Sequence, residues 1–589
     1  MPNKMFINLL IFLLSAIGLI PSIGFTATYW VSPNGTATWA NCRSETPLDG
    51  TAACSLNTAN SNVSPGDTVY LRGGTYNTHI FPARSGDASN RITYTAYSGE
   101  TPIIRNTTTP YATYYHGIAL TGRNYIKIIG VTVDNPINEV PLGKSRPLMI
   151  THGGSYNEIA NCIIDGNGGG TIQIWKGNSD LGPEYAAKFN WIHDNYIIRT
   201  GSVSTNCDDD GGMQIGVPAY DNVSGYNTIE NNVFYAGGHH NLETYTKYNV
   251  IRNNIFHHEN GSFTAPNPPC PYRGGGPNGD QYGNRNIQIY DGYNEDKFNL
   301  IEGNKFGHSG QPPDDDGGDG FTLTAPKNIV RYNAIYNSQN NGILMKTGAS
   351  SYADYNRIYN NTIYYSGSWY SGSGQWQGAN FRWYGSYARV GNVIKNNILY
   401  SYGPGGKDWT GGSATIYTDN TVINNFCTDP QPGRCSANGN PLLVNPDISD
   451  PTSLTLPDLR LQSNSPAIDG GTHLTLAKGS GNNSTTLVVD DALYFQDGTW
   501  GSSLSNIQAD WIAIGSVDNV VQIKSINYST NTITLKSPMS WSDRAKIWLY
   551  KKSDGERVLY GSAPDFGAYE FIPTIDKQSP IPPKNLRIQ

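Results

Sequence analysis

The sequence predicts an all-β solenoid, in which short strands stack coil upon coil along one axis. Between Asn124 and Phe426 one phrase recurs nine times: an Asn, an apolar residue two positions on, a second Asn five on, and an apolar residue seven on. The leading Asn residues lie 22 to 50 positions apart. We therefore expect every coil to share the same core phrase and to differ in the length of its loop insertions.

The Asn and apolar positions of this phrase have distinct expected roles. Asn tolerates left-handed turn conformations, and its amides can hydrogen-bond from one coil to the next, while the Ile and Phe positions fill the interior. A β-sandwich or propeller is the alternative, but neither repeats Asn at a fixed offset from a short strand. The leading residues are Asn157, Asn190, Asn227, Asn249, Asn299, Asn328, Asn356, Asn392 and Asn420.

Composition narrows the function classes. The 589-residue chain is longer than one ordinary globular core, but a solenoid grows along its axis without that limit. It contains 66 Gly and 39 Tyr residues and only 15% charged residues, which suits tight turns and neutral aromatic surfaces for sugar binding, or a rigid rod. The net charge of −7 argues against a nucleic-acid partner.

The first 27 residues predict export. Lys4 precedes an apolar run from Phe6 to Ile20, and Pro21 and Gly24 follow, which is typical of a signal peptide. We expect a secreted or cell-surface protein, extracellular or periplasmic, with an uncleaved membrane anchor as the alternative. No later stretch is long and apolar enough to span a bilayer.

The seven cysteines are an odd number, so at least one thiol is expected to stay unpaired within the chain. Cys42 with Cys54, and Cys427 with Cys435, are close enough in sequence to close small loops. Cys162 stands where the phrase has its second Asn, which favours a buried packing role.

Two phrases near the start carry a family resemblance. Residues 66–71 (Gly-Asp-Thr-Val-Tyr-Leu) and 74–76 (Gly-Thr-Tyr) resemble the opening of secreted right-handed parallel β-helix proteins of the pectate-lyase-like superfamily, which include chondroitinase-B-type and alginate lyases. The resemblance extends over residues 28–470 and implies a right-handed parallel β-helix with an N-terminal cap. It also implies a polysaccharide substrate or ligand.

The C-terminal part predicts an inserted module. Residues 464–471 and 565–570 resemble two phrases that close such helices nearly side by side, but here about 90 residues separate them. The insert, residues 471–562, contains alternating strands and reads as a small β-barrel that either binds carbohydrate or only caps the helix. Residues 563–577 are expected to close the helix, and residues 578–589 to form a flexible tail.

A second strand precedes each Asn phrase, and alternation divides its side chains between core and surface. Such an outward face forms a polar and aromatic track several sugars long, although a solvated sheet is the simpler alternative. The predicted inward residues include Ile172, Ile174, Met213, Ile215, Leu242, Ile287, Ile289, Phe321, Leu323, Ile343, Met345, Phe381 and Trp383. The predicted substrate-binding residues are Gln173, Trp175, Gln214, Tyr245, Gln288, Tyr290 and Tyr384, and Thr322 lies on the same face.

Catalysis is expected near Glu243. A lyase needs a base beside the uronate carboxylate and a cation to stabilise the enolate, and Glu243 with Asn241 is the predicted calcium site. The resemblance to chondroitinase-B-type lyases implies a Lys base, which Lys247 approximates, and an assisting Arg. The Arg-His-Gly phrase of that family is absent, so Lys346 and Arg382 are the further catalytic candidates.

Two acidic loops offer further metal ligands. Clustered carboxylates beside Gly suit calcium, or the paired acids of a glycoside hydrolase. The Gly-His-Gly and Arg-Ile-Lys phrases of polygalacturonase-like hydrolases are absent, and solvated loops are an equal alternative. His239, His240, His257, His258 and Glu259 leave a transition-metal site open without a decisive spacing. The loop candidates are Asp208, Asp209, Asp210, Asp314, Asp315, Asp316 and Asp319.

The sequence therefore predicts a monomeric secreted β-helix protein that cleaves a uronate-containing polysaccharide by calcium-assisted β-elimination. A non-catalytic adhesion protein that binds polysaccharide is the first alternative, and a glycoside hydrolase with paired Asp or Glu is the second.

Overall fold

The computed structural model describes residues 27–572, apart from 109, 111–113, 137–138, 141–143, 168–169, 201–211, 219, 236, 238–239, 258–284, 292–294, 310–317, 339, 348–351, 368–377, 386–388, 402–406, 412–418 and 450–454. The predicted signal peptide, but for Ala27, and the predicted tail lie outside these residues. No helix among the described residues is long and apolar enough to cross a membrane.

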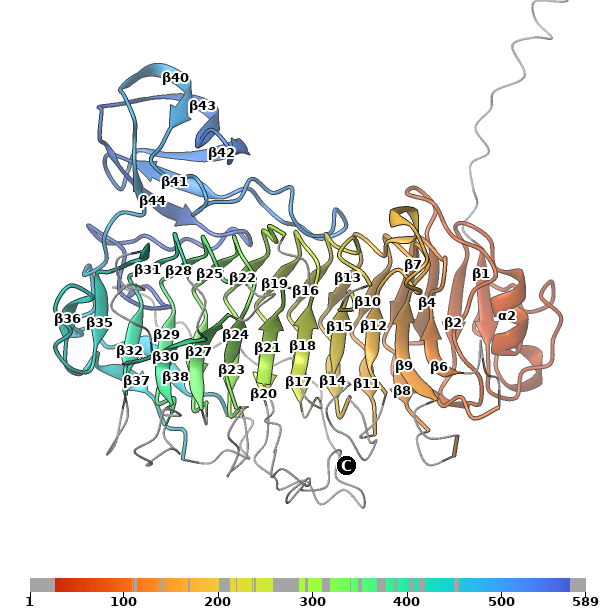
Figure 1. Cartoon of the computed structure of the whole chain (residues 1–589). Coiled ribbons are helices and arrows are strands. Elements are labelled where there is room, and N and C mark those ends of the chain that lie inside the picture. Colours follow the sequence, from red (N-terminus) through yellow and green to blue (C-terminus); the bar gives the residue numbers. More distant parts are fainter. Residues whose placement is uncertain are drawn as a thin grey trace, which may run out of the picture.

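Three long parallel sheets, here called A, B and C, wind around one axis as a right-handed β-helix (Figure 1). Each coil contributes one short strand to each sheet over most of the length, as the repeated phrase predicts. The predicted fold class is therefore confirmed.

Sheet A contains, in spatial order, β1 (Thr28–Val31), β2 (Thr68–Leu71), β4 (Ile92–Ala96), β7 (Ile126–Ile129), β10 (Glu158–Ala160), β13 (Trp191–His193), β16 (Thr228–Glu230), β19 (Val250–Arg252), β22 (Leu300–Glu302), β25 (Ile329–Arg331), β28 (Arg357–Tyr359), β31 (Val393–Lys395) and β34 (Thr421–Ile423). Sheet B contains β3 (Gly74–Tyr76), β5 (Pro102–Ile104), β8 (Thr132–Asp134), β11 (Ile163–Asp165), β14 (Tyr196–Ile198), β17 (Val233–Tyr235), β20 (Ile255–His257), β23 (Lys305–Gly307), β26 (Ala334–Tyr336), β29 (Thr362–Tyr364), β32 (Ile398–Tyr400), β35 (Asn425–Cys427) and β36 (Cys435–Asn438). Sheet C contains β6 (Tyr115–Ala119), β9 (Ser145–Ile150), β12 (Ile172–Ile174), β15 (Met213–Ile215), β18 (His240–Thr244), β21 (Arg285–Ile289), β24 (Phe321–Leu323), β27 (Asn341–Lys346), β30 (Ala379–Tyr384) and β33 (Trp409–Thr410).

Two ladders of buried Asn side chains run along the helix. In the first, each leading Asn from Asn157 to Asn392 donates its backbone N–H to the Oδ1 of the leading Asn in the next coil, at 2.8–3.1 Å. The second ladder, from Asn195 to Asn425, repeats this bond at 2.9–3.0 Å. The predicted amide stacking is confirmed.

The left-handed backbone lies one residue earlier than the sequence suggested. Residues that precede a ladder Asn have positive φ, for example Tyr156 (57°), Tyr248 (60°), Asn253 (55°) and Asn360 (50°). This conformation is unfavourable for a side chain with a Cβ. Before the first ladder the residue is usually aromatic, and its ring stacks on its counterpart in the next coil, as Tyr226 does on Tyr248 at 4.7 Å between centroids.

The interior is a continuous apolar core. All the apolar residues predicted to point inward from the second strand of each coil belong to it and are nearly inaccessible to solvent, and Thr244, also predicted inward, is fully buried. Cys162 is a buried free cysteine at the start of the second ladder, where its backbone N–H donates to Asn195 Oδ1 at 2.9 Å. Burial raises the pKa of its thiol to about 12, which fits the predicted packing role.

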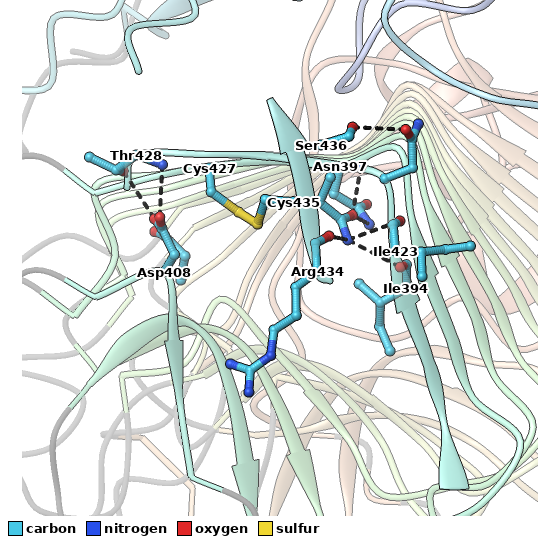
Figure 2. Close-up of a disulfide and its surroundings, with 12 residues drawn as sticks. Ile394, Asn397, Asp408, Ile423, Cys427, Thr428, Arg434, Cys435 and Ser436 are labelled. Carbon is cyan, nitrogen blue, oxygen red and sulfur yellow. Dashed lines mark hydrogen bonds between the residues drawn. A yellow bond between two sulfur atoms is a disulfide. The ribbon is translucent and has the colours of Figure 1, made fainter. Parts of the chain in front are cut away.

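Both ends of the helix are closed and tied by a disulfide. At the N-terminal end α2 (Leu56–Asn62) covers the core with Leu56 and Ala59, beside the short helix η1 (Gly50–Ala52) and the Cys42–Cys54 disulfide. At the other end the Cys427–Cys435 disulfide joins β35 to β36 (Figure 2). Both predicted pairs are confirmed. A second short helix, η2 (Pro183–Tyr185), lies in a turn.

The two separated closing phrases lie side by side. Phe566 donates its backbone N–H to Ala467 O at 2.9 Å, and the backbone N–H of Asp469 donates to Asp565 Oδ1 at 2.7 Å. The antiparallel pair β37 (Leu443–Asn445) and β38 (Asp458–Leu461) packs nearby through Leu443, Leu459 and Leu461. The chain therefore leaves the helix and returns to the same place.

Between these phrases the chain forms a six-stranded antiparallel sheet, here called the barrel module. Its strands in spatial order are β39 (Thr475–Leu476), β44 (Lys546–Lys551), β41 (Trp511–Ile514), β42 (Val520–Asn527), β43 (Thr532–Trp541) and β40 (Gly481–Val488). A bridge between Ala477 and Val489, next to the two edge strands, closes the sheet on itself.

The barrel module lies against the outer surface of sheet A (Figure 1). At the centre of the contact Arg331, fully buried, pairs with Glu302 on the neighbouring coil at 2.5 Å and with Asp510 of the barrel module at 2.7 Å. Ser553 adds a hydrogen bond to Glu302 at 2.5 Å. Because every charge here has a partner, burial is tolerated.

The first prediction concerns the ladders. In Asn304→Ala, the Asn254 backbone N–H, the Asn254 side-chain amide and the Ile251 carbonyl each lose one hydrogen bond, so we expect a loss of about 2–4 kcal/mol in the free energy of unfolding. The urea midpoint of the full chain measures it. Asn41→Ala, at an exposed position of the cap, is the matched control and should leave the midpoint nearly unchanged. Equal midpoints for both variants would contradict a stabilising role for the ladder.

The second prediction concerns the barrel module. Arg331→Met leaves Glu302 and Asp510 buried without their cation, which should cost about 3–5 kcal/mol and expose residues 471–562 to limited proteolysis. Lys327→Met removes a cation from a half-exposed pair with Asp296 and should change stability by less than about 1 kcal/mol. Protease resistance like that of the unmodified chain in Arg331→Met would refute the docking role of this cluster.

Candidate functional site

The outer face of sheet C carries two parallel rows of side chains in strict register. Residues of the first row pair strand to strand and alternate with core residues on either side. From β12 to β30 the first row consists of Gln173, Gln214, Glu243, Gln288, Thr322, Leu344 and Arg382. The second row, two residues further along each strand, includes Trp175, Tyr245, Tyr290, Lys346 and Tyr384.

Glu243 stands at the middle of a hydrogen-bonded chain in the first row. Gln173 Nε2 donates to Gln214 Oε1 at 3.1 Å, and Gln214 Nε2 donates to Glu243 Oε1 at 2.7 Å. The Tyr245 hydroxyl donates to Glu243 Oε2 at 2.9 Å. Burial, with the adjacent Glu243 charge, raises the pKa of Tyr245 well above its usual value, so its hydroxyl stays protonated.

A histidine and an arginine extend this chain toward the next coils. His240 Nδ1 lies 3.5 Å from Glu243 Oε2, and its Nε2 lies 2.6 Å from Gln288 Oε1. Arg285 Nη1 lies 3.4 Å from His240 Nε2, and Arg285 Nε lies 3.5 Å from Asp319 Oδ2. The carboxylate, imidazole and guanidinium groups thus form one continuous polar network.

Sequence reasoning underrated two members of this network. The sequence patterns point to His240 only as a transition-metal ligand, and they do not point to Arg285. Arg285 stands two residues before the core residue Ile287, at the position that pairs with His240 in the neighbouring strand. That spacing is the signal that could have brought both residues together with Glu243.

The two rows differ in exposure. Glu243, Gln288 and Arg382 retain only 5%, 7% and 4% of their accessible surface. Trp175, Tyr290, Lys346 and Tyr384, by contrast, are partly exposed. A ligand approaching from solvent therefore meets the aromatic second row first.

Two cations of sheet C, Lys346 and Arg382, lie close to the ring of Tyr384. Lys346 Nζ lies 5.7 Å from the centroid of Tyr384, and the Arg382 guanidinium lies 5.2 Å from it. On the other side of the track, the rings of Tyr245 and Tyr290 lie 5.0 Å apart. The exposed row thus has an aromatic part and a cationic part.

The predicted catalytic cations do not form one centre with Glu243. Lys346 and Arg382 lie on the predicted sheet, but three and four strands from β18, which is about 14 and 19 Å along the axis. Lys247 lies beyond the end of β18, where its Nζ faces Glu295 at 4.0 Å. The separations of Lys346 and Arg382 from β18 exceed one sugar unit, so these two residues do not fit the role of a base beside Glu243. The assignment of Lys247 stays a prediction.

The predicted metal ligands are also dispersed. Asn241 is fully buried; its amide donates to Asn286 Oδ1 at 3.0 Å and its oxygen accepts from the Gly237 N–H at 2.9 Å. Asp319 is equally buried and accepts from Asn341 at 2.7 Å and from Thr322 at 3.1 Å.

The remaining acidic candidates, Asp208, Asp209, Asp210, Asp314, Asp315 and Asp316, lie outside the described residues. Among the residues that are described, no three His, Cys, Asp or Glu side chains cluster as metal ligands. The described groups around Glu243 therefore do not fit a calcium site on their own, and calcium remains a prediction.

This architecture is a right-handed parallel β-helix, the fold that the resemblance at the N-terminus implied. Residues 29–236 match the family model described as "Pel9A-like, right handed beta helix region", which covers less than half of the chain. The search with this chain found no matching curated protein sequence.

Solved structures similar to this chain include a pectate lyase, Pel9A, with 14% identity, a TM-score of 0.39, and coverage of 76% of this chain and 92% of its own. A mannuronic-acid-specific polysaccharide family 6 lyase from human gut microbiota has 15% identity and a TM-score of 0.45, covering 68% and 86%. A GH136 lacto-N-biosidase from Eubacterium ramulus has 12% identity and a TM-score of 0.33, covering 70% and 66%. At these values the likenesses concern architecture alone.

Proposed function

We propose that the chain is a secreted polysaccharide lyase that binds a uronate-containing polymer along the outer face of sheet C. The observation that carries this proposal is the pair of in-register rows, in which a similar position recurs on successive strands about 4.8 Å apart. A polymer of repeating sugars laid along the helix axis meets a new strand at nearly every unit.

The exposed second row supplies the binding groups. Trp175, Tyr290 and Tyr384 offer ring faces to the apolar faces of sugars, and Lys346 offers a positive charge to uronate carboxylates. Arg382, a first-row residue with 4% of its surface accessible, adds a second positive charge beside the Tyr384 ring. In this proposal both cations bind substrate away from the reacting bond, which replaces their predicted catalytic roles.

The network around Glu243 supplies the chemistry. In β-elimination a base removes the proton at C5 of the uronate, the C4–O4 bond breaks, a C4=C5 double bond forms, and O4 leaves with a proton. His240 is the proposed base, and Glu243, 3.5 Å away, stabilises the imidazolium that forms. Tyr245, kept protonated by burial, is the proposed donor to O4, and Arg285, beside His240, is the proposed partner of the uronate carboxylate.

The hydrolase alternative is less well supported by the same residues. A glycoside hydrolase needs two carboxylates that flank a cleft, one on each side of the scissile bond. Asp319, which joins the network of Glu243 through Arg285, has no accessible surface, and both its oxygens accept hydrogen bonds from Asn341 and Thr322.

The third prediction tests this function. Glu243→Gln removes the charge that stabilises the His240 imidazolium, so kcat should fall about 100-fold or more on the cleaved polymer. Lys346→Met should instead raise KM several-fold with kcat nearly unchanged, because it loses binding remote from the reaction. Lys327→Met, which removes a surface cation from a pair with Asp296, is the charge-matched control for Lys346→Met.

The measurement is the ultraviolet absorbance of new unsaturated ends on pectate, alginate and chondroitin, with reducing ends assayed in parallel. Reducing ends without new absorbance would mean hydrolysis, and neither signal would leave the binding protein as the correct class. A parallel series with calcium and with chelator tests the calcium expectation: activity that survives chelation would refute it.

A further inference from the structure

The barrel module carries a row of side chains of its own, here called the Trp511 row. It crosses four strands: Lys551 on β44 pairs with Trp511 on β41, next to an irregularity of the ladder, Trp511 pairs with Gln522 on β42, and Lys536 on β43 lies beside Gln522. The neighbours Ile512, Val521, Ile523 and Leu535 point into the module's core. The Trp511 row therefore lies on the outer face of the module.

Contacts within the row hold its side chains in place. Lys551 Nζ lies 5.2 Å from the centroid of the Trp511 ring, and Lys536 Nζ donates to Gln522 Oε1 at 2.8 Å. Trp511 and Gln522 are partly exposed, and Lys536 is exposed. A flat ring flanked by cations and an amide is thus presented to solvent.

The charge of this face is one-sided. Lys524 lies two residues after Gln522, on the same face of β42. The Arg557 guanidinium lies 5.0 Å from the centroid of the Tyr550 ring. Within the described part of the chain, none of Lys524, Lys536, Lys551 and Arg557 forms an ion pair. This is a local excess of cations on a protein with a net charge of −7.

The row is held rigidly next to the helix. Asp510, which precedes Trp511, is the buried partner of Arg331, and Ser553, two residues after Lys551, donates to Glu302. The strand ends that carry Trp511 and Lys551 are therefore fixed to sheet A.

We propose that the Trp511 row is a second polysaccharide-binding site, whose ligand is an anionic, uronate-containing polymer. The Trp511 ring covers the apolar face of a sugar, the lysines pair with carboxylates, and Gln522 binds hydroxyls. The choice of a uronate-containing polymer rests on the proposed function, whereas the assignment of the Trp511 row as a binding site does not depend on it. Such a site raises the local concentration of polymer at the helix.

The test is a binding measurement on the full chain carrying Glu243→Gln, so that cleavage does not disturb it. Isothermal titration with polygalacturonate, alginate and a neutral galactan compares this background with added Trp511→Ala, and with added Lys536→Gln and Lys551→Gln. Each addition should weaken binding of the anionic polymers about tenfold. Thermal unfolding confirms that each variant folds.

The charge-matched control is Lys478→Gln with Arg544→Gln, which removes two cations of the same module that already face Asp490. It should bind like the background. Three outcomes would overturn the inference. The Lys536/Lys551 variant would bind with the same affinity as the background, or the control would lose as much affinity as that variant, or the background would bind no uronate polymer. Because the readout is affinity, Trp511-dependent binding can stand even where wild-type protein cleaves nothing, so the two proposals fail separately.

Discussion

The structure depends on one constraint: a buried Asn amide must find its acceptor in the next coil. Within each ladder, beyond its first Asn, the Oδ1 accepts both a backbone N–H and a side-chain amide from the coil before, as Asn304 does from Asn254. A buried amide without a hydrogen-bond partner costs more free energy than a single hydrogen bond contributes to stability. The coils are therefore locked in register however long the insertions between them, and a slip by one residue would break every bond of the ladder.

Register in the ladders sets the geometry of the distant outer face. The two Asn ladders do not run through sheet C. Gln214, Glu243 and Gln288 nevertheless lie in one line, because the ladders hold successive coils in the same register. The first row is consequently close enough to hydrogen-bond to itself and loses most of its exposure. The second row, apart from the buried Tyr245, stays partly accessible. One face thus contains a preorganised polar layer beneath a binding surface.

The sequence predicted the repeating parts of this molecule well. The Asn phrase predicted the coils, alternation predicted which side chains of sheet C face outward, and spacing predicted two disulfides. Distances along the axis were harder, because Lys346 and Arg382 share a sheet with Glu243 but are separated from it by whole coils. The left-handed residue was misplaced by one position, since aromatic residues such as Tyr248 occupy it against their own preference and are stabilised by stacking. The pair of Arg331 with Asp510, 179 residues apart, has no local signal at all.

The barrel module contacts sheet A at six successive strands, from Thr228 on β16, through Arg252, Glu302, Arg331 and Arg357, to Lys395 on β31. In a bare solenoid each coil interacts only with its neighbours, so unfolding can start at one coil and spread in steps. A rigid brace across six coils couples them directly. We therefore expect this middle section to open as a single cooperative unit, with the cap and the first coils as a separate one.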